Sequence, residues 1–398
     1  MKNDLVHILF SGGVTGGHLF PGLAVAEQIR ALYPRARITF AGAGRVLDRE
    51  QVFQAGHEYL GIPCHASPRR LSQIARFLRD NRKGVQKAKQ FIEEKHVSLV
   101  IGLGGYASVP SARAATRCGV PLVLLEQNVY PGRATRWLAR SAALMLLAFR
   151  DTKEHLRTRG SLEVPGNPVR SEFLAMRSEA EATDPVADNG AQRRLLILGG
   201  SNGAGELNEQ VPRALYRCRE QLQDWQITHQ SGETQHAATE ELYRKLGIAA
   251  DVIPFVANMA TTLAKTDAAI SRSGGTTLAE LAVSHVPSVL CPLASATDDH
   301  QRLNAEYYAS RRAAVLVPSS RISAKHETTR QDVAIADALL PLLTSEAERT
   351  ALATGMARLA RPNASLRAAE SILKLVRPTR SVPPPLGSTM PSTVESRF

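Results

Sequence analysis

The chain has 398 residues, enough for two domains, and its 43% hydrophobic and 22% charged residues are ordinary for a soluble globular protein. Its formal net charge of +12 favours anionic partners such as nucleic acid, an acidic membrane or phosphorylated ligands, although a generally basic surface explains it equally well. The four cysteines are far apart, so the sequence indicates neither a disulfide framework nor a zinc site.

The sequence contains no pattern typical of a membrane anchor or a secretion signal. The first residues lead directly into a strand-like run at Leu5–Phe10, without the apolar core of a signal peptide. The longest strongly apolar run, Ala142–Phe149, is far too short to span a bilayer. We therefore expect a protein that is kept in the cytosol, where it can still contact a membrane surface.

The first half of the chain alternates between strand and helix patterns. It opens with an apolar run at Val6–Phe10, a glycine-rich turn at Ser11–Gly17 and a stretch with helical apolar spacing at Leu23–Leu32. This alternation predicts a parallel, doubly wound sheet. Further buried strands are expected at Ile38–Ala41, Leu99–Ile101, Leu122–Leu125 and Leu144–Ala148.

The turn after the first strand reads Ser-Gly-Gly-Val-Thr-Gly-Gly and is followed by His18. Its glycines permit a tight strand-to-helix turn and let a ligand approach the backbone closely. The spacing differs from that of a P-loop. A histidine at the end of such a loop lies where a ligand would dock and can exchange protons near neutral pH. His18 is therefore a candidate catalytic base, with a purely structural role as the alternative.

A second glycine pattern lies in the middle of the first half. Gly102–Ala107 follows a predicted strand and fits GxGxxG/A, and Glu126 ends the next strand at about the spacing of a ribose-binding acid. An NAD-dependent oxidoreductase is therefore a competing interpretation. The internal position of the pattern weakens it, as does Pro110 early in the expected helix, although a proline is tolerated in a first turn.

The segment Arg69–Lys89 carries eight basic residues and a single acid, Asp80. This composition, with apolar residues interleaved at helical spacing, is typical of a helix that lies on an anionic lipid surface. It is equally typical of a surface helix whose apolar side faces the protein core. The apolar residues in question are Leu71, Ile74, Phe77 and Leu78.

The strand–turn–helix pattern restarts in the second half, after a polar stretch at Ser178–Arg193 that we interpret as a linker or long loop. Leu195–Leu198 is a predicted strand, followed by a glycine-rich turn at Gly199–Gly205 and a helix to about Arg219. Both halves thus open with the same unit, which is an architectural repeat. Further strands are expected at Ile227–His229, Val252–Ile253, Ala268–Ser271 and Ser288–Cys291.

Two loops of the second half have the chemistry to bind a phosphorylated ligand. Gly199–Ala204 presents backbone amides at a helix N-terminus, with Ser201 as a further donor to a phosphate oxygen. Ser271–Thr277 places Arg272 among small residues. Glu280 lies one turn into the following helix, where its carboxylate could hold both ribose hydroxyls or could simply stabilise the helix dipole.

A last polar group in the second half is formed by His300, Gln301 and Asn304, whose side chains could hydrogen-bond sugar hydroxyls. The Asp-x-Asp pattern that clamps a metal and a diphosphate in many nucleotide-sugar enzymes occurs nowhere in the sequence. We therefore expect no metal and no other cofactor. Helix dipoles and Arg272 would then stabilise a leaving diphosphate.

Several motifs in a fixed order resemble the MurG family of bacterial glycosyltransferases. The resemblance runs from about Leu5 to Val376. The order and spacing of the motifs make the set far more specific than any single motif. It outweighs the NAD interpretation. The motifs are Thr15–Ala24, Gly104–Ser108, Glu126–Asn128, Gly166–Arg170, Gly199–Ala204, Ser271–Glu280 and His300–Ala305.

The resemblance implies the two-domain fold called GT-B, in which two Rossmann-like domains face each other across the active-site cleft. It implies transfer of GlcNAc from UDP-GlcNAc to lipid I, the undecaprenyl-diphosphate-linked muramyl-pentapeptide, which gives lipid II for peptidoglycan synthesis. It further implies that Val256 lies by the uracil and that Glu280 holds the ribose. The full set of implied donor-binding residues is Thr15, Gly16, Gly17, Asn128, Arg170, Ser201, Val256, Arg272, Glu280 and Gln301.

We interpret the reaction as an inverting, metal-independent transfer in which His18 takes the proton of the acceptor C4 hydroxyl. Three residues depart from the family pattern: Val14 restricts the first glycine turn, Leu125 replaces a common histidine, and Asn202 replaces a common glutamine. Alternatives within the same fold are another lipid-directed glycosyltransferase and a UDP-GlcNAc epimerase. A non-catalytic, basic membrane-binding protein is an alternative of another class.

The expected domains are an acceptor- and membrane-facing domain at residues 1–170 and a UDP-GlcNAc-binding domain at 171–375, whose last helices could pack back on the first domain. Residues 376–398 are rich in Pro, Ser and Thr and are expected to form a disordered tail. The resemblance implies a peripheral protein on the cytoplasmic face of the membrane. Its expected partners are UDP-GlcNAc, lipid I, anionic lipid and proteins of cell-wall synthesis or division, but not nucleic acid.

Overall fold

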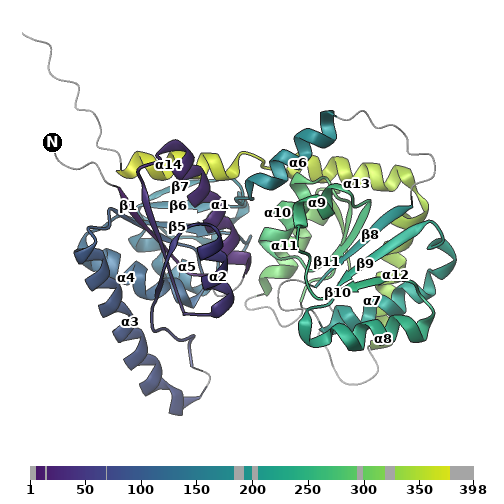
Figure 1. Cartoon of the computed structure of the whole chain (residues 1–398), viewed down its shortest axis with the longest axis horizontal. Helices are drawn as coiled ribbons and strands as arrows, with labels where there is room; N and C mark the ends of the chain where they lie inside the picture. Colours follow the sequence, from purple (N-terminus) through teal and green to yellow (C-terminus); the bar gives the residue numbers. More distant parts are fainter. Residues whose placement is uncertain are drawn as a thin grey trace, which may run out of the picture.

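Two parallel sheets, one in each half of the chain, organise the fold (Figure 1). The computed structural model describes residues 6–13, 16–68, 70–182, 192–199, 205–293, 299–318 and 328–376. Within these residues the first sheet has the strand order β3-β2-β1-β4-β5-β6-β7 and the second has β10-β9-β8-β11-β12-β13. Both contain the doubly wound order of a Rossmann fold, so the prediction of two Rossmann-like halves is confirmed.

The first half contains seven strands among the described residues, joined largely by helices. The strands are β1 His7–Ser11, β2 Arg37–Gly42, β3 Glu58–Gly61, β4 Leu99–Gly102, β5 Leu122–Glu126, β6 Leu144–Leu147 and β7 Ser161–Glu163. The helices are α1 Gly16–Leu32, α2 Val46–Gln54, α3 Ile74–Glu94, α4 Val109–Cys118 and α5 Arg133–Leu138, with 3-10 turns at Leu71–Gln73, Tyr106–Ser108, Ala139–Ser141 and Asp151–His155.

The second half repeats the arrangement. Its strands are β8 Arg193–Leu198, β9 Trp225–Gln230, β10 Asp251–Ile253, β11 Ala268–Ser271, β12 Ser288–Leu290 and β13 Ala314–Leu316. Its helices are α6 Ser171–Ala182, α7 Gly205–Arg217, α8 His236–Leu246, α9 Met259–Ala264, α10 Gly275–Val283, α11 His300–Ala309, α12 Thr328–Thr344 and α13 Glu346–Leu359, with 3-10 turns at Arg219–Gln221 and Glu233–Gln235.

The last helix, α14 Ala364–Val376, crosses from the second half to the first and packs beside α1 (Figure 1). Ala368, Ile372 and Leu373 are buried in the same apolar cluster as Val25 and Ile29 of α1. Burial of an isoleucine, leucine or valine side chain stabilises the fold by about 1.5–3 kcal/mol relative to exposure. The chain therefore ends, as far as it is described, against the domain in which it began.

The central strands are buried on both faces because helices cover each side of the sheet. In β1 all five residues are buried, and so are all five in β5. Side chains on one face of the first sheet pack with α1 and α14, and those on the other face pack with α3 and α4. A strand covered on both faces carries a continuous apolar run, which is why these strands could be predicted from the sequence.

The structure corrects several boundaries that the sequence suggested. The polar stretch Ser178–Arg193 is not all linker, because its first residues complete α6 and Arg193 begins β8; residues 183–191 lie outside the described part. Val376 belongs to α14 and not to a tail, and residues 377–398 lie outside the described part. No helix in the described ranges is long and apolar enough to cross a membrane.

Candidate active site

The two sheets bring their carboxyl ends together around a cavity of about 240 Å³ between the halves. In each sheet the strand order reverses between its first and fourth strands, and ligands of such folds bind at this switch point. The first half contributes Gly16, Gly17, Phe20, Gln51 and Gln54 to the wall. The remaining lining residues are Arg170, Leu198, Gln230, Phe255, Val256, Ala257, Met259, Thr276, Thr277 and Glu280.

Two contacts hold the halves together beside this cavity. Thr276 at the start of α10 donates its hydroxyl to the carbonyl oxygen of Gly17 over 2.7 Å. Close by, a Cβ atom on Gly275 would lie only 2.0 Å from the carbonyl oxygen of Gln127. Only a glycine allows the backbone of α10 to approach the first half this closely. The Ser271–Thr277 loop is thus a contact between the domains as well as the start of a helix.

Glu280 is only 6% exposed and lies on the wall of the cavity, on α10. Burial raises the pKa of its carboxyl group to about 7, although the neighbouring Arg170 acts in the opposite direction. Nη2 of Arg170 lies 3.4 Å from Oε1 of Glu280. Phe20 and Phe173 flank the same guanidinium, with ring centroids at 4.7 and 5.1 Å. The cavity therefore contains the carboxyl group of Glu280, which titrates near neutral pH, and the guanidinium of Arg170, which two aromatic rings hold in place.

The apolar side of the cavity comes from the segment that follows β10. Val256 is buried, whereas the ring of Phe255 is 55% exposed. Both residues line the cavity together with Met259. A flat apolar wall beside a buried carboxylate suits a heterocyclic base attached to a ribose. The sequence-based assignment of Val256 to the uracil stays a prediction, and its position is compatible with that assignment.

His18 lies in the first turn of α1 and packs against the glycine loop that follows β4. A Cβ atom on Gly104 would lie 2.8 Å from Cδ2 and 3.2 Å from Nε2 of His18, so the ring needs a glycine at that position. Burial, with a smaller contribution from the nearby His300, lowers the pKa of His18 to about 4. The imidazole is therefore neutral at pH 7 and able to accept a proton.

The Gly102–Ala107 pattern that suggested NAD serves a different purpose here. Gly104 makes room for His18, and the carboxylate of Glu126 is occupied by its own loop. Oε1 of Glu126 accepts the backbone N–H of Asn128 over 3.1 Å, and Oε2 accepts that of Gly132 over 3.1 Å. Glu126 is buried and thus fixes a turn, leaving no free carboxylate for a ribose.

Asn128 connects the halves and does not line the cavity. Its Oδ1 accepts a hydrogen bond from Nδ2 of Asn304 over 3.0 Å, and Oδ1 of Asn304 accepts the backbone N–H of Val129 over 2.9 Å. Nδ2 of Asn304 also donates to the carbonyl of Ser273. Two asparagines from motifs 176 residues apart thus form one network across the domain boundary.

Arg272 and Gln301 lie behind the cavity wall. The buried guanidinium of Arg272 donates to the carbonyls of Cys291 and Pro292 over 3.0 and 3.1 Å, and to Glu206 over 2.8 Å. Oε1 of Gln301 accepts the backbone N–H of Leu293 over 3.0 Å. Both side chains hold the ends of neighbouring loops in place.

The remaining sequence-based candidates separate into two groups. Gly16 and Gly17 line the cavity, whereas Thr15 and Ser201 lie outside the described residues, as do the departures Val14 and Asn202. The third departure, Leu125, is a core residue of β5. Sequence reasoning missed Gln51, Gln54 and Gln230 as lining residues, because an isolated glutamine in a helix or at a strand end carries no local signal. Phe20 and Thr277 lie within motifs that the sequence singled out, but neither was assigned to the lining.

Comparison with known proteins decides the family. Residues 8–146 match the glycosyltransferase family 28 N-terminal domain, and residues 194–353 match the family 28 C-terminal domain. A protein of Sorangium cellulosum (strain So ce56) is 34% identical over 94% of this chain and 90% of its own length; its name is UDP-N-acetylglucosamine--N-acetylmuramyl-(pentapeptide) pyrophosphoryl-undecaprenol N-acetylglucosamine transferase. A protein of Stutzerimonas stutzeri (strain A1501) with the same name is 36% identical over 90% of this chain and 96% of its own. The chain belongs to the MurG family of glycosyltransferases.

Solved structures agree with membership of the MurG family. Acinetobacter baumannii MurG superposes with a TM-score of 0.69 at 27% identity, covering 93% of this chain and 99% of that one. A putative UDP-N-acetylglucosamine 2-epimerase from Listeria monocytogenes has a TM-score of 0.66 at 14% identity, covering 93% and 96%. At that identity the epimerase shares the GT-B fold alone, so the expected fold class is confirmed and the epimerase alternative is not favoured.

Proposed function

We propose that this chain transfers GlcNAc from UDP-GlcNAc to the C4 hydroxyl of MurNAc in lipid I, giving lipid II. Membership of the MurG family supports the donor and the acceptor. The cavity between the halves supports the reaction type, because it combines glycine backbone, a buried carboxylate and an apolar wall. Transfer of radiolabel from UDP-GlcNAc to a lipid I analogue tests the proposal, and UDP release without labelled lipid would contradict it.

In the proposed mechanism His18 acts as the general base. Its neutral imidazole removes the proton of the acceptor hydroxyl while that oxygen attacks C1 of GlcNAc and the bond from C1 to the UDP oxygen breaks. Attack opposite to the leaving group inverts the anomeric centre. UDP leaves with the bonding electron pair, toward the N-terminus of α10 and the loop after β8, where helix dipoles favour negative charge. Arg272 contacts the carbonyls of the segment after β12 and Glu206 at the start of α7, and so links the segment before α10 to these two elements.

The donor assignments follow from the same cavity. We propose that Glu280 accepts the ribose hydroxyls, that Val256 lies by the uracil, and that Arg170 stays paired with Glu280 beside them. Thr15, Gly16, Gly17 and Ser201 belong to the two glycine loops that approach the donor. Asn128 and Gln301 hold the loops that shape the site.

Replacing Glu280 with alanine is expected to weaken UDP binding by about 1–3 kcal/mol, the contribution of a charge-assisted hydrogen bond. Because the pKa of Glu280 is about 7, its carboxylate is lost as the pH falls through 7, and UDP affinity should fall with it. Glu280→Gln should bind weakly and with little pH dependence. Calorimetry from pH 6 to 8 measures both effects; unchanged affinity in the alanine variant would remove Glu280 from the ribose site.

Transfer is expected to continue in EDTA, because the sequence lacks an Asp-x-Asp clamp and the leaving diphosphate has helix N-termini to stabilise it. The measurement is the initial rate of label transfer after dialysis against EDTA, with and without added Mg²⁺ or Mn²⁺. Complete loss in EDTA with full recovery on adding a metal would contradict the proposed stabilisation.

The membrane-facing surface is proposed to lie on the first half, around the start of α3. The side chain of Leu71 is 86% exposed, and those of Ile74 and Leu78 are also exposed. Three of the four apolar residues at this end of the segment therefore do not face the core, whereas Phe77 is half-buried. The later part of α3 packs on α4 through residues such as Val85 and Ala88. The exposed end thus combines apolar side chains with the basic residues of the same segment.

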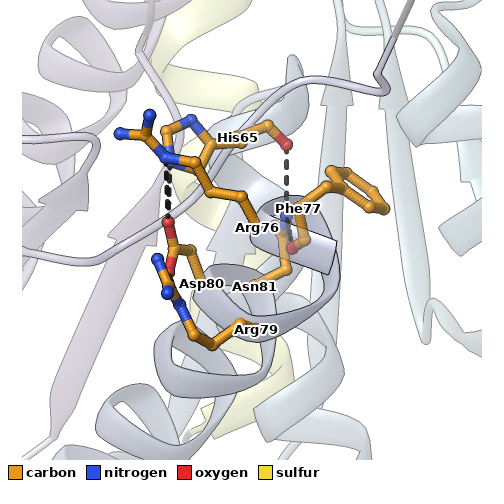
Figure 2. A network of polar contacts seen from close by, with 6 residues as sticks. All are labelled: His65, Arg76, Phe77, Arg79, Asp80 and Asn81. Carbon is orange, nitrogen blue, oxygen red and sulfur yellow. Dashed lines mark hydrogen bonds and ion pairs between the residues drawn. The ribbon is translucent and has the colours of Figure 1, made fainter. Parts of the chain in front are cut away.

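A polar network fixes this end of α3 on the adjacent loop (Figure 2). Asp80 accepts hydrogen bonds from Nε2 of His65 over 3.0 Å and from Nε of Arg79 over 2.9 Å, and Nε of Arg76 lies 3.6 Å away. Asn81 donates to the backbone carbonyl of His65 over 3.3 Å. The network ties the start of α3 to the loop at His65, and Asp80 is the carboxylate that contacts these cations among the described residues.

Reversing Arg76, Arg79 and Arg82 to glutamate is expected to weaken binding to anionic vesicles by at least about a hundredfold, since each cation near such a surface contributes about 1 kcal/mol. High salt should imitate the variant. The matched control reverses three exposed arginines of the second half, Arg213, Arg244 and Arg358. Co-sedimentation measures binding; if both variants sediment like the parent, the membrane contact lies elsewhere.

We further propose that this contact keeps the protein peripheral on the cytoplasmic face of the membrane, where lipid I and UDP-GlcNAc can meet. Proteins of cell-wall synthesis or division are the partners that this location would favour. Fractionation of cells followed by extraction of the membranes with high salt tests the location. Recovery only after detergent would contradict an electrostatic, peripheral contact.

A further inference from the structure

A second cavity, of about 290 Å³, lies between the two halves on the other side of α10. The first half contributes the end of β6 and the loop after β7, and the second half contributes α10, α11 and the segment after α13. The lining residues used below are Arg150, Asp151, Asn167, Ala279, Arg311 and Arg361.

This cavity is separate from the donor cavity although α10 forms a wall of both. Thr277 and Glu280 face the donor cavity, whereas Ala279, Ala282 and Val283 line the second one. Residues at these spacings project from different sides of one helix. A ligand in the second cavity would therefore not occupy the position of the nucleotide.

Three arginines and one carboxylate line the second cavity. Arg311 is shared between Asp151, at 3.4 Å, and the ring of Tyr307, whose centroid lies 3.6 Å from the guanidinium carbon. Nη1 of Arg361 donates only to backbone carbonyls, at 2.8 and 3.1 Å. Neither Arg150 nor Arg361 forms an ion pair with another described residue. The cations come from both halves, so an anion between them would bridge the halves.

Asn167 supplies an independent observation. Its side chain is only 6% exposed, and neither the oxygen nor the nitrogen of its amide has a hydrogen-bond partner among the described residues. Buried amides without a partner are rare and call for an explanation such as an unseen ligand. The stem of Arg361 packs close to Asn167, since a Cβ on the adjacent Gly166 would lie 2.5 Å from Cβ of Arg361. The amide of Asn167 and the side chain of Arg361 therefore lie on the same part of the cavity wall.

We propose that this second cavity is a binding site for a small free anion of the phosphate class, held by Arg150 and Arg361 and by the amide of Asn167. A tetrahedral anion offers several acceptor oxygens, which suits two guanidinium groups and an amide N–H from different directions. The side chains of Arg150 and Arg361 are exposed, whereas the amide of Asn167 is buried between the halves. An anion that contacts all three must be small enough to enter, which favours a free anion over a lipid headgroup. Bound there, the anion ties the end of β6 to the segment after α13.

The test follows thermal unfolding of the full chain with inorganic phosphate as the probe. UDP binding is measured first by calorimetry, so that failure of the donor assignment is seen separately; saturating UDP then keeps phosphate out of the donor cavity. Ionic strength is held constant with chloride. Phosphate at about ten times its dissociation constant should raise the Tm of the parent by about 1–2 °C.

Two variants and a control decide whether that shift comes from this cavity. Arg150→Gln combined with Arg361→Gln should abolish the shift, as should Ala279→Met, which fills the cavity without changing charge. Arg358→Gln, one turn before Arg361 and outside the lining, should retain it. The proposal would be overturned if phosphate did not raise the Tm of the parent. It would also be overturned if phosphate raised the Tm of both cavity variants as much as that of the parent.

Discussion

Replacing His18 with alanine is expected to lower the rate of GlcNAc transfer by about 100- to 10,000-fold, the range for loss of a general base. The reason is its position: the ring lies at the start of α1, next to Gly17 on the cavity wall, and is held against Gly104. UDP affinity should change little, because most residues that line the donor cavity belong to the second half. The measurement is single-turnover transfer at saturating donor, with calorimetry of UDP on the same sample.

Glutamine at position 18 separates catalysis from packing. It keeps a polar side chain in the same space but cannot take up a proton at neutral pH. We expect His18→Gln to be as slow as His18→Ala while its Tm stays near that of the parent. Transfer at the parental rate in the glutamine variant would show that His18 only supports the Gly104 loop.

The pH dependence gives a second view of the same residue. In the free protein, burial holds the pKa of His18 at about 4, so the base is lost only when the pH falls through that value. Because Glu280 itself titrates near pH 7, this limb is measured in the Glu280→Gln variant, where kcat/KM, which reports the free enzyme, is expected to fall only near pH 4. The negative diphosphate of the bound donor should raise the pKa in the complex, so the limb of kcat should lie higher. A limb of kcat/KM at the ordinary histidine value would contradict the burial.

The central architecture could be predicted from the sequence because its signals are local. Strands such as Val6–Phe10 and Leu195–Leu198 are short apolar runs that end in glycine turns, and the structure has β1 and β8 there. The edge strands β3, β7 and β13 were missed. Ser161–Glu163 has three residues and none is buried, so it shows no apolar run. Its pairing with β6 depends on contacts that only the folded chain provides.

The site shows the same division between local and long-range information. Gly17 could be identified because it ends a glycine-rich turn whose composition suggests ligand binding, and Glu280 because it lies one turn into the helix that follows such a loop. The lining by Gln51 could not be, because α2 shows no chemical pattern and reaches the cavity only through the packing of the first half. The sequence equally gave no sign that Arg272 would be engaged by the carbonyls of Cys291 and Pro292. Tertiary structure decides whether a buried arginine bonds to backbone carbonyls or to a ligand.

The contact between the halves leads to the second large effect: Gly275→Ala is expected to lower transfer by about 100-fold or more. The added Cβ would lie 2.0 Å from the carbonyl oxygen and 3.0 Å from the carbonyl carbon of Gln127. Both are backbone atoms, so no side-chain rotation relieves the clash and α10 must move away from the first half. The hydrogen bond from Thr276 to Gly17 would then lengthen. A misplacement of about 1 Å between reacting groups can cost a hundredfold in rate.

The neighbouring glycine provides the matched control. A Cβ on Gly274 meets only Oγ1 of Thr277, at 3.9 Å, which is an ordinary contact. Gly274→Ala should therefore transfer at a rate closer to the parent than Gly275→Ala does, because no clash forces α10 away from the first half. Since Gly274 caps α10 beside the proposed diphosphate position, calorimetry of UDP on both variants separates an effect on donor binding from an effect on transfer. Each half has a core of its own, and a further buried cluster joins the halves through α10, so Gly275→Ala should stay folded with a lower Tm while its transfer falls. Equal activity in the two variants would mean that the contact between Gly275 and Gln127 is not part of the catalytic arrangement. Loss of activity in Gly275→Ala alone would show that the approach of the two halves, and not merely the presence of their residues, is what the reaction requires.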